Sequence, residues 1–171
     1  MAGACASVER VASPAMQGDP TVIELLNEVL TAELTAINQY FVDAKMCGSW
    51  GLERLAEQFR DESIDEMKDA DALIERILYL EGMPNLQRLG TVRVGETVPE
   101  KLSLALDLEK AAVERLNRAI AAAREAGDNG SRELFERILV GEEHHADWLE
   151  AQLAAIEQVG VSNYLAQQLR S

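Results

Sequence analysis

The sequence contains little cysteine, proline or aromatic residue, and it has no long apolar run. Its 171 residues include only 2 cysteines, 4 prolines and 5% aromatic residues. Cys5 and Cys47 show neither CxxC spacing nor a CxxCH haem-attachment motif, so no structural disulfide and no covalent haem are predicted. No uninterrupted apolar segment approaches the length of a transmembrane helix. These absences favour a protein of the reducing cytoplasm.

Basic residues are also in the minority. The chain has 16 lysines and arginines against 30 acidic residues, which gives a net charge of −14. Such a surface repels nucleic acid and anionic membranes and attracts cations, so we expect neither a nucleic-acid partner nor a membrane partner. Most of this charge is expected to be ordinary solvated helix surface.

The composition favours an all-α fold, because Ala, Leu, Glu and Arg are abundant and proline is scarce. The length suits one domain with a single sizeable core. Residues 1–15 include Glu9 and Arg10 and lack the apolar segment of a secretory signal, so we predict a mobile N-terminal extension there. Residues 16–171 are predicted to form the folded domain.

Apolar stripes at helical spacing predict four long helices, at about residues 20–47, 49–81, 98–126 and 130–159, and a short fifth helix at 162–169. Short turns near Gly48 and residues 128–130 make two antiparallel hairpins. Residues 82–98 have no helical stripe and can extend about 55 Å at about 3.3 Å per residue. They can therefore run along a bundle of about 40 Å. The expected fold is a ferritin-like four-helix bundle with a long crossover between helices 2 and 3.

Four glutamates recur at a fixed interval on the apolar stripes. Glu33 precedes Glu66 by 33 residues, and Glu109 precedes Glu142 by the same number. Each pair lies almost symmetrically about the turn of its hairpin, so its two members are expected to meet at one level of the bundle. Two hairpins therefore offer matching inward carboxylates.

The second glutamate of each hairpin opens an i, i+3 pair, Glu66 with Asp69 and Glu142 with His145. Inward carboxylates with Glu-x-x-His on facing helices are typical of di-iron bundles. A single glutamate on an apolar stripe is usually a boundary residue that reaches solvent or pairs with an arginine. Four at one level would repel one another unless cations bind between them. The pattern thus predicts a metal centre, and its ligands suit iron or manganese.

From residue 16 onwards the chain resembles the bacterioferritins, most clearly in residues 33–41 (ELTAINQYF), 62–67 (ESIDEM) and 81–87 (EGMPNLQ). The resemblance implies an iron-storage and detoxification protein that forms a hollow 24-subunit homo-oligomer built from dimers. It would oxidise Fe(II) with O2 or H2O2 at an intrasubunit di-iron centre and deposit a ferric mineral. Non-covalent haem b between pairs of subunits and a ferredoxin-like reductant for iron release are also implied.

By the same resemblance, six residues bind the two irons: Glu66 and Glu142 as bridges, Glu33 and Asp69 at one position, and Glu109 with His145 at the other. The family has histidine where this chain has Asp69. Two hypotheses follow from that departure. One is a working but altered ferroxidase centre, and the other is a ferroxidase-poor shell subunit that co-assembles with an active second bacterioferritin chain.

Met67 and Tyr40 acquire functional roles only through the resemblance. Met67 follows Glu66 by about 100° around the helix, on a flank where a lone methionine usually fills an interface. The resemblance makes it the axial ligand of haem, one from each of two subunits. Tyr40 lies on the stripe of Glu33, where packing is the usual role, and the resemblance makes it a candidate electron donor. A di-iron enzyme with an organic substrate is a third possibility, against which Met67 and the fifth helix argue as assembly elements.

Overall fold

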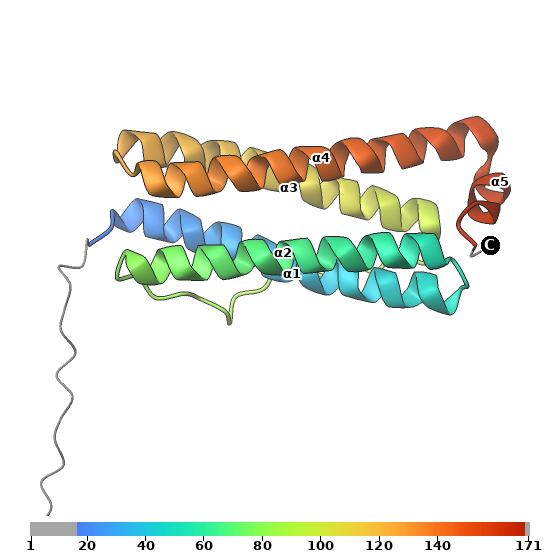
Figure 1. Cartoon of the computed structure of the whole chain (residues 1–171), viewed down its shortest axis with the longest axis horizontal. Coiled ribbons are helices and arrows are strands. Elements are labelled where there is room, and N and C mark those ends of the chain that lie inside the picture. The colour runs from blue at the N-terminus through green and yellow to red at the C-terminus, as the bar shows by residue number, and fades with distance from the viewer. Residues whose placement is uncertain (1–16, 170–171) are drawn as a thin grey trace, which may run out of the picture.

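The computed structural model describes residues 17–169, and over that range it contains five helices and no strand. The helices are α1 (Pro20–Ser49), α2 (Glu53–Tyr79), α3 (Val98–Glu125), α4 (Asn129–Val159) and α5 (Val161–Ala166). Figure 1 shows two hairpins, α1 with α2 and α3 with α4, joined by a long crossover outside the bundle. The predicted all-α bundle with a crossover and a short fifth helix is confirmed. The predicted extension, residues 1–15, lies outside the part that the structure describes.

Side-chain caps define where three of the long helices begin. Asp19 accepts hydrogen bonds from the backbone N–H groups of Thr21 and Val22, and proline occupies the first turn of α1. Thr97 and Asp128 cap α3 and α4 in the same way. Such caps satisfy N–H groups that have no partner within the helix. Within residues 17–169, no helix combines the length and apolarity needed to cross a membrane.

Two helix boundaries differ from the predicted ones by three residues or more, and the others agree within two residues. The second helix begins at Glu53 and not at residue 49, because Gly51 turns the chain with a φ of 77°. The fifth helix ends at Ala166 and not at residue 169. The turn that follows it is attached to the beginning of α2, since the carbonyl of Gln168 accepts a hydrogen bond of 3.2 Å from the backbone N–H of Arg54. This contact places α5 across the end of the bundle (Figure 1).

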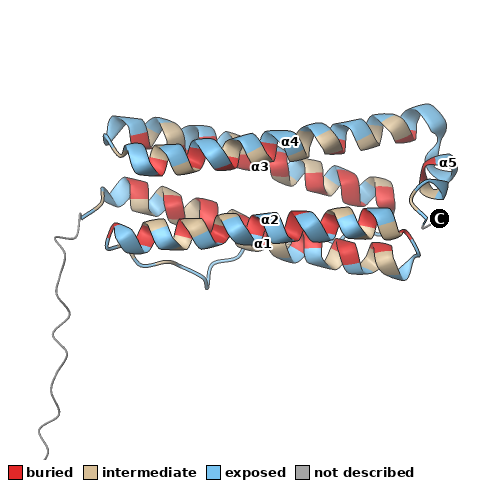
Figure 2. Cartoon of the chain, in the orientation of Figure 1, coloured by how far each residue is buried: buried red, intermediate tan, exposed pale blue. Residues whose placement is uncertain are grey.

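The apolar core consists of two clusters, one in each half of the bundle. One cluster includes Leu26 and Leu30 of α1 together with Phe135 and Ile138 of α4. The other includes residues from the second half of α1, the first halves of α2 and α3, and α5. Figure 2 shows the buried residues along the inward faces of the four long helices. The four predicted glutamates lie in sequence between the residues of the two clusters, so a buried acidic layer interrupts the core.

One buried ion pair lies among the residues of the second cluster. The Nζ atom of Lys101 is 2.6 Å from Oδ1 of Asp43, and both side chains are fully buried. The ammonium group also lies 5.4 Å from the centre of the Trp50 ring and 3.2 Å from the sulfur of Met46. Lys101 belongs to the first turn of α3 and Asp43 to α1, so the pair connects the two hairpins.

Candidate metal centre

Four glutamates, one from each long helix, converge in the middle of the bundle. Glu33 comes from α1, Glu66 from α2, Glu109 from α3 and Glu142 from α4, and none is more than 3% exposed. Each sits on the stripe of apolar residues that its helix turns inward, so packing of the stripes carries the carboxylates into the interior. The structure therefore places all four predicted glutamates in one buried layer.

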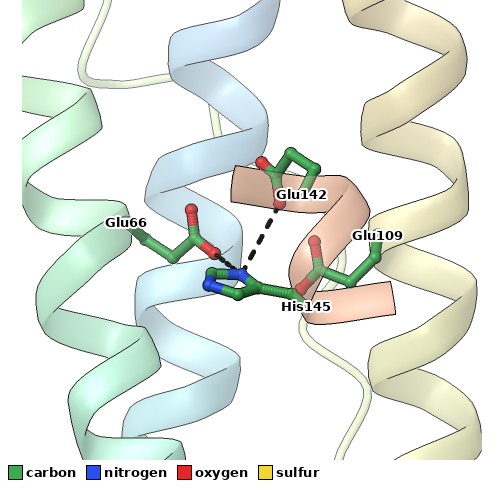
Figure 3. Close-up of side chains that lie close together, drawn as sticks. All are labelled: Glu66, Glu109, Glu142 and His145. Carbon is green, nitrogen blue, oxygen red and sulfur yellow. Dashed lines mark ion pairs between the residues drawn. The ribbon is translucent and has the colours of Figure 1, made fainter. Parts of the chain in front are cut away.

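His145 lies next to these carboxylates, one turn after Glu142 on α4. Its Nδ1 atom is 3.5 Å from Oε1 of Glu66 and 3.9 Å from Oε2 of Glu142 (Figure 3). One ligand atom each from Glu66, Glu109, Glu142 and His145 can be chosen so that all lie within 4.8 Å of one another. This is the spacing of groups that can share a bound cation, and their residues come from three helices (Figure 3).

Burial disfavours the charged form of three of these carboxylates, Glu33, Glu109 and Glu142. Burial and the neighbouring Glu66 raise the pKa of Glu33 well above its ordinary value. Burial and the neighbouring Glu109 do the same for the pKa of Glu142. Burial also raises the pKa of Glu109, although Glu142 and His145 partly oppose this effect. Protons therefore occupy this layer when no cation does, and a cation that binds there must displace them.

The imidazole of His145, in contrast, favours its charged form. Burial alone would lower its pKa, but Glu62, Glu66 and Glu109 favour the charged form and raise the pKa to about 10. The strongest of these contacts is with Glu62, whose Oε2 atom is 2.5 Å from Nε2 of His145. His145 is thus a charged partner of the carboxylates in the metal-free site, and it must lose a proton before it can ligate a metal.

Glu62 is a residue of the site that sequence reasoning missed. It is buried on α2, accepts a hydrogen bond of 2.6 Å from Gln58, and faces His145. The sequence spacing could have indicated Glu62, because it precedes Glu66 by one helical turn and therefore lies on the same face of α2. Glu62, Asp65 and His145 also offer ligand atoms within 4.8 Å of one another. His145 therefore lies between two groups of carboxylates.

The two remaining predicted ligands are placed differently. Glu33 adjoins Glu66, and its Oε1 atom is buried with no hydrogen-bond partner. Asp69 does not join the close group of ligand atoms. Its Oδ1 atom instead accepts a hydrogen bond of 3.0 Å from Nη1 of Arg137 on α4. Burial raises the pKa of Asp69, and Arg137 partly opposes that rise.

Tyr40 and Met67 occupy contrasting positions. Tyr40 is buried, its ring lies 6.0 Å from that of Phe59 at an interplanar angle of 21°, and its hydroxyl has no hydrogen-bond partner. It lines one small space together with Glu62 and His145. Met67 is 54% exposed on α2. Tyr40 is thus close to the carboxylate layer, whereas Met67 points to the exterior of the single subunit.

The donor set matches the requirements of a small, hard cation. Both carboxylate oxygens of Glu109 are buried, and within residues 17–169 their only hydrogen-bonding neighbour is the carboxyl group of Glu142. Buried polar atoms in folded proteins normally have partners, so these oxygens are suited to a ligand from outside the chain. Carboxylates with one imidazole favour iron or manganese. The residues present therefore fit a site for such ions.

The helical bundle and its buried carboxylate layer define a ferritin-like protein, and comparison with known families agrees. The model of the ferritin-like domain family ("Ferritin") matches residues 23–159. The chain is 51% identical over 152 residues to a bacterioferritin from Mycobacterium leprae, covering 89% of this chain and 96% of that one. It is 53% identical over 151 residues to a bacterioferritin from Streptomyces coelicolor, covering 88% and 90%. A bacterial ferritin from Synechocystis is 44% identical over 155 residues, covering 90% and 99%.

The chain therefore belongs to the bacterioferritin family within the ferritin-like proteins. This membership agrees with the resemblance predicted from the sequence. Iron storage is the function that it supports.

Proposed function

We propose that this chain oxidises Fe(II) at two adjacent positions inside each subunit and stores the ferric product within a cytoplasmic shell of 24 subunits. The observation that carries the proposal is the close group formed by Glu66, Glu109, Glu142 and His145, with ligand atoms within 4.8 Å of one another. Among residues 17–169, no N–H group donates a hydrogen bond to Glu109, so its oxygens are available to a cation that displaces the proton shared with Glu142. Four carboxylates in one apolar layer are otherwise hard to explain.

The residues have distinct roles in this proposal. Glu66 and Glu142, on facing helices, bridge the two Fe(II) ions. Glu109 and His145 complete the first position. Glu33, whose free Oε1 atom is buried beside Glu66, completes the second position, with Asp69 at its edge. Ion binding displaces the protons that the raised pKa values retain in this layer, so the site exchanges protons for metal.

The oxidation requires an external electron acceptor. Two Fe(II) ions give up two electrons and become two Fe(III) ions. O2 takes these electrons with two protons to form H2O2, or H2O2 takes them with two protons to form two waters. Where only one Fe(II) is bound, Tyr40, which lines the space beside His145, would supply the second electron together with its phenol proton and become a tyrosyl radical. The carboxylates hold the two irons together and stabilise the ferric product through their negative charge.

Shell assembly and haem binding complete the proposal. The net charge of −14 draws Fe(II) towards the protein and favours mineral formation. Met67 and Ile64 are exposed and lie one turn apart on α2, and an exposed thioether beside an apolar side chain suits one half of a haem site shared by two subunits. Met67 would supply one axial sulfur from each subunit. The bound haem would carry electrons from a ferredoxin-like reductant to the stored iron.

One observation favours a second candidate function. Asp69 bonds to Arg137 and stands apart from the close group of ligand atoms. A subunit with an incomplete second position would oxidise iron slowly. It would still build shells, and it would depend on an active second bacterioferritin chain for rapid oxidation.

Aerobic iron loading separates these functions. Purified protein is exposed to excess Fe(II), sized by gel filtration and assayed for iron per subunit, alongside Glu142→Gln and the control Glu143→Gln, which alters an exposed neighbour. We expect shell-sized particles that retain far more than two irons per subunit, a marked loss in Glu142→Gln and none in Glu143→Gln. A small oligomer with only ligand-bound iron would instead indicate a different di-iron enzyme. Shells that load iron only when mixed with an active chain would favour the second candidate.

A further inference from the structure

Asp69 and Arg137 form a bridge between α2 and α4 at the edge of the metal centre. Asp69 follows Glu66 by one helical turn, and its side chain is 20% exposed. Arg137 precedes Glu142 by five residues on α4, and its side chain is 56% exposed. The bond between them is 3.0 Å long. A cation beside Glu66 and Glu33 would therefore have to share Asp69 with a guanidinium group or displace it.

The guanidinium opposes a second cation in two ways. It occupies Oδ1 of Asp69, the side chain predicted to complete the position of Glu33 and Glu66. It also adds a positive charge close to a site that must accept a doubly charged ion. At the position of Glu109 and Glu142 the neighbouring basic group is His145, which is itself one of the proposed ligands, whereas the guanidinium of Arg137 cannot ligate a metal. The two metal positions are therefore built unequally.

We propose that Arg137 is a positioning residue that holds Asp69 away from the centre, so that the second metal position is the weaker one. A cation fills this position only when Asp69 exchanges Arg137 for the metal. The pair reforms when the cation leaves, because both side chains are partly exposed and need only rotate. The second position thus binds its ion more weakly than the first and releases it more readily. This inference rests on the proposed metal centre and specifies how its two halves differ.

Anaerobic titration with Co(II) tests the inference without iron oxidation. Calorimetry gives the two dissociation constants per subunit, and the visible absorption of Co(II) reports its ligands. The variants are Arg137→Gln, Asp69→Asn and the double variant. Arg132→Gln is the matched control, because Arg132 pairs only with Glu136 on its own helix and its removal lowers the charge of α4 equally.

The unmodified protein should bind one Co(II) tightly and a second more weakly. Arg137→Gln should tighten the second site by about fivefold, the upper range for a partly exposed ion pair, and leave the first unchanged. Arg132→Gln should alter neither site. In the Asp69→Asn background, Arg137→Gln should have a clearly smaller effect, because the carboxylate that it releases is gone and only the charge of the guanidinium remains to be removed.

Several results would overturn the inference. Equal affinities in the unmodified protein would show that Arg137 does not weaken the second position. A weaker second site in Arg137→Gln would mean that the arginine orients Asp69 for ligation. An equal gain in the Asp69→Asn background would mean that only long-range charge acts. Failure of the unmodified protein to bind any Co(II), or binding unaffected by Glu142→Gln, would overturn the metal centre itself and so is distinguishable from failure of the Arg137 inference alone.

Discussion

Replacing Glu33 by glutamine should stabilise the metal-free protein. Glu33 is 1% exposed, and its Oε1 atom has no hydrogen-bond partner. Burial keeps a proton on this carboxyl group in the folded protein, whereas the unfolded chain releases it near neutral pH. Glutamine has nearly the same shape and has no proton to take up on folding. We therefore expect Glu33→Gln to raise the free energy of unfolding at pH 8 by about 1–3 kcal/mol, or the midpoint of thermal unfolding by about 3–10 °C.

The stability gained by Glu33→Gln should increase as the pH rises. Burial and Glu66 raise the pKa of Glu33 above the ordinary value of 4.5. The unfolded chain loses this proton as the pH rises through about 4.5, while the folded protein still retains it, so the wild-type protein becomes progressively less stable relative to its unfolded state. The glutamine variant has no such loss. The difference between the two proteins should be small at about pH 5 and largest near pH 8.

Differential scanning calorimetry of metal-free protein at equal subunit concentration provides the measurement. Glu24→Gln, which alters an exposed carboxylate on the same helix, is the control and should change little at either pH. Adding Mn(II) should stabilise the wild-type protein more than Glu33→Gln, because the variant has lost a ligand. A metal-free Glu33→Gln protein that is less stable than wild type at pH 8, or equally shifted at pH 5 and pH 8, would refute the reasoning.

Three further predictions concern other parts of the molecule. Mn(II) affinity should rise with pH between about 6 and 8, because binding should release protons from the buried carboxyl groups. Calorimetry in two buffers of different ionisation enthalpy measures the number of protons released. No proton release would contradict the raised pKa values of these groups. Lys101→Met should destabilise the protein by about 3–5 kcal/mol in thermal unfolding, because Asp43 then carries an unpaired buried charge. Lys101→Met with Asp43→Leu should recover most of that loss, and a double variant as unstable as the single one would argue against the ion pair. After incubation with haem and removal of the unbound excess, Met67→Leu should lose or shift the Soret band, while Met83→Leu, at an exposed methionine of the crossover, should keep that of the unmodified protein. An unchanged band in Met67→Leu would exclude Met67 as the axial ligand.

Local patterns were sufficient to predict most of the fold. The Asp19–Pro20 pair marks the beginning of α1 because an N-cap side chain and a proline act within a single turn. The inward direction of Glu33 and Glu142 follows from helical periodicity, since the apolar residues that flank them must be buried. The long segment without a helical stripe could only join hairpins lying side by side. Each of these inferences depends on residues close together in sequence.

The side-chain pairing within the site could not be predicted in this way. Asp69 and Arg137 are 68 residues apart, and their bond depends on the side-chain rotamers that two packed helices permit. The contact of Glu62 with His145 likewise depends on how α2 and α4 face one another. Periodicity gives the face of a helix on which a residue lies, but it does not give the atom that the residue contacts. For that reason the pairing of Asp69 with Arg137 became visible only in three dimensions.

Rapid-mixing oxidation of Fe(II) tests the central proposal most directly. Metal-free shells are mixed aerobically with increasing Fe(II), from below one ion to several ions per subunit, and Asp69→His is measured in parallel. A ferroxidase centre in this chain predicts a fast phase that saturates near about two Fe(II) per subunit in the unmodified protein. The absence of such a phase, with recovery in Asp69→His, would contradict the account and show that this subunit depends on a partner chain for iron oxidation.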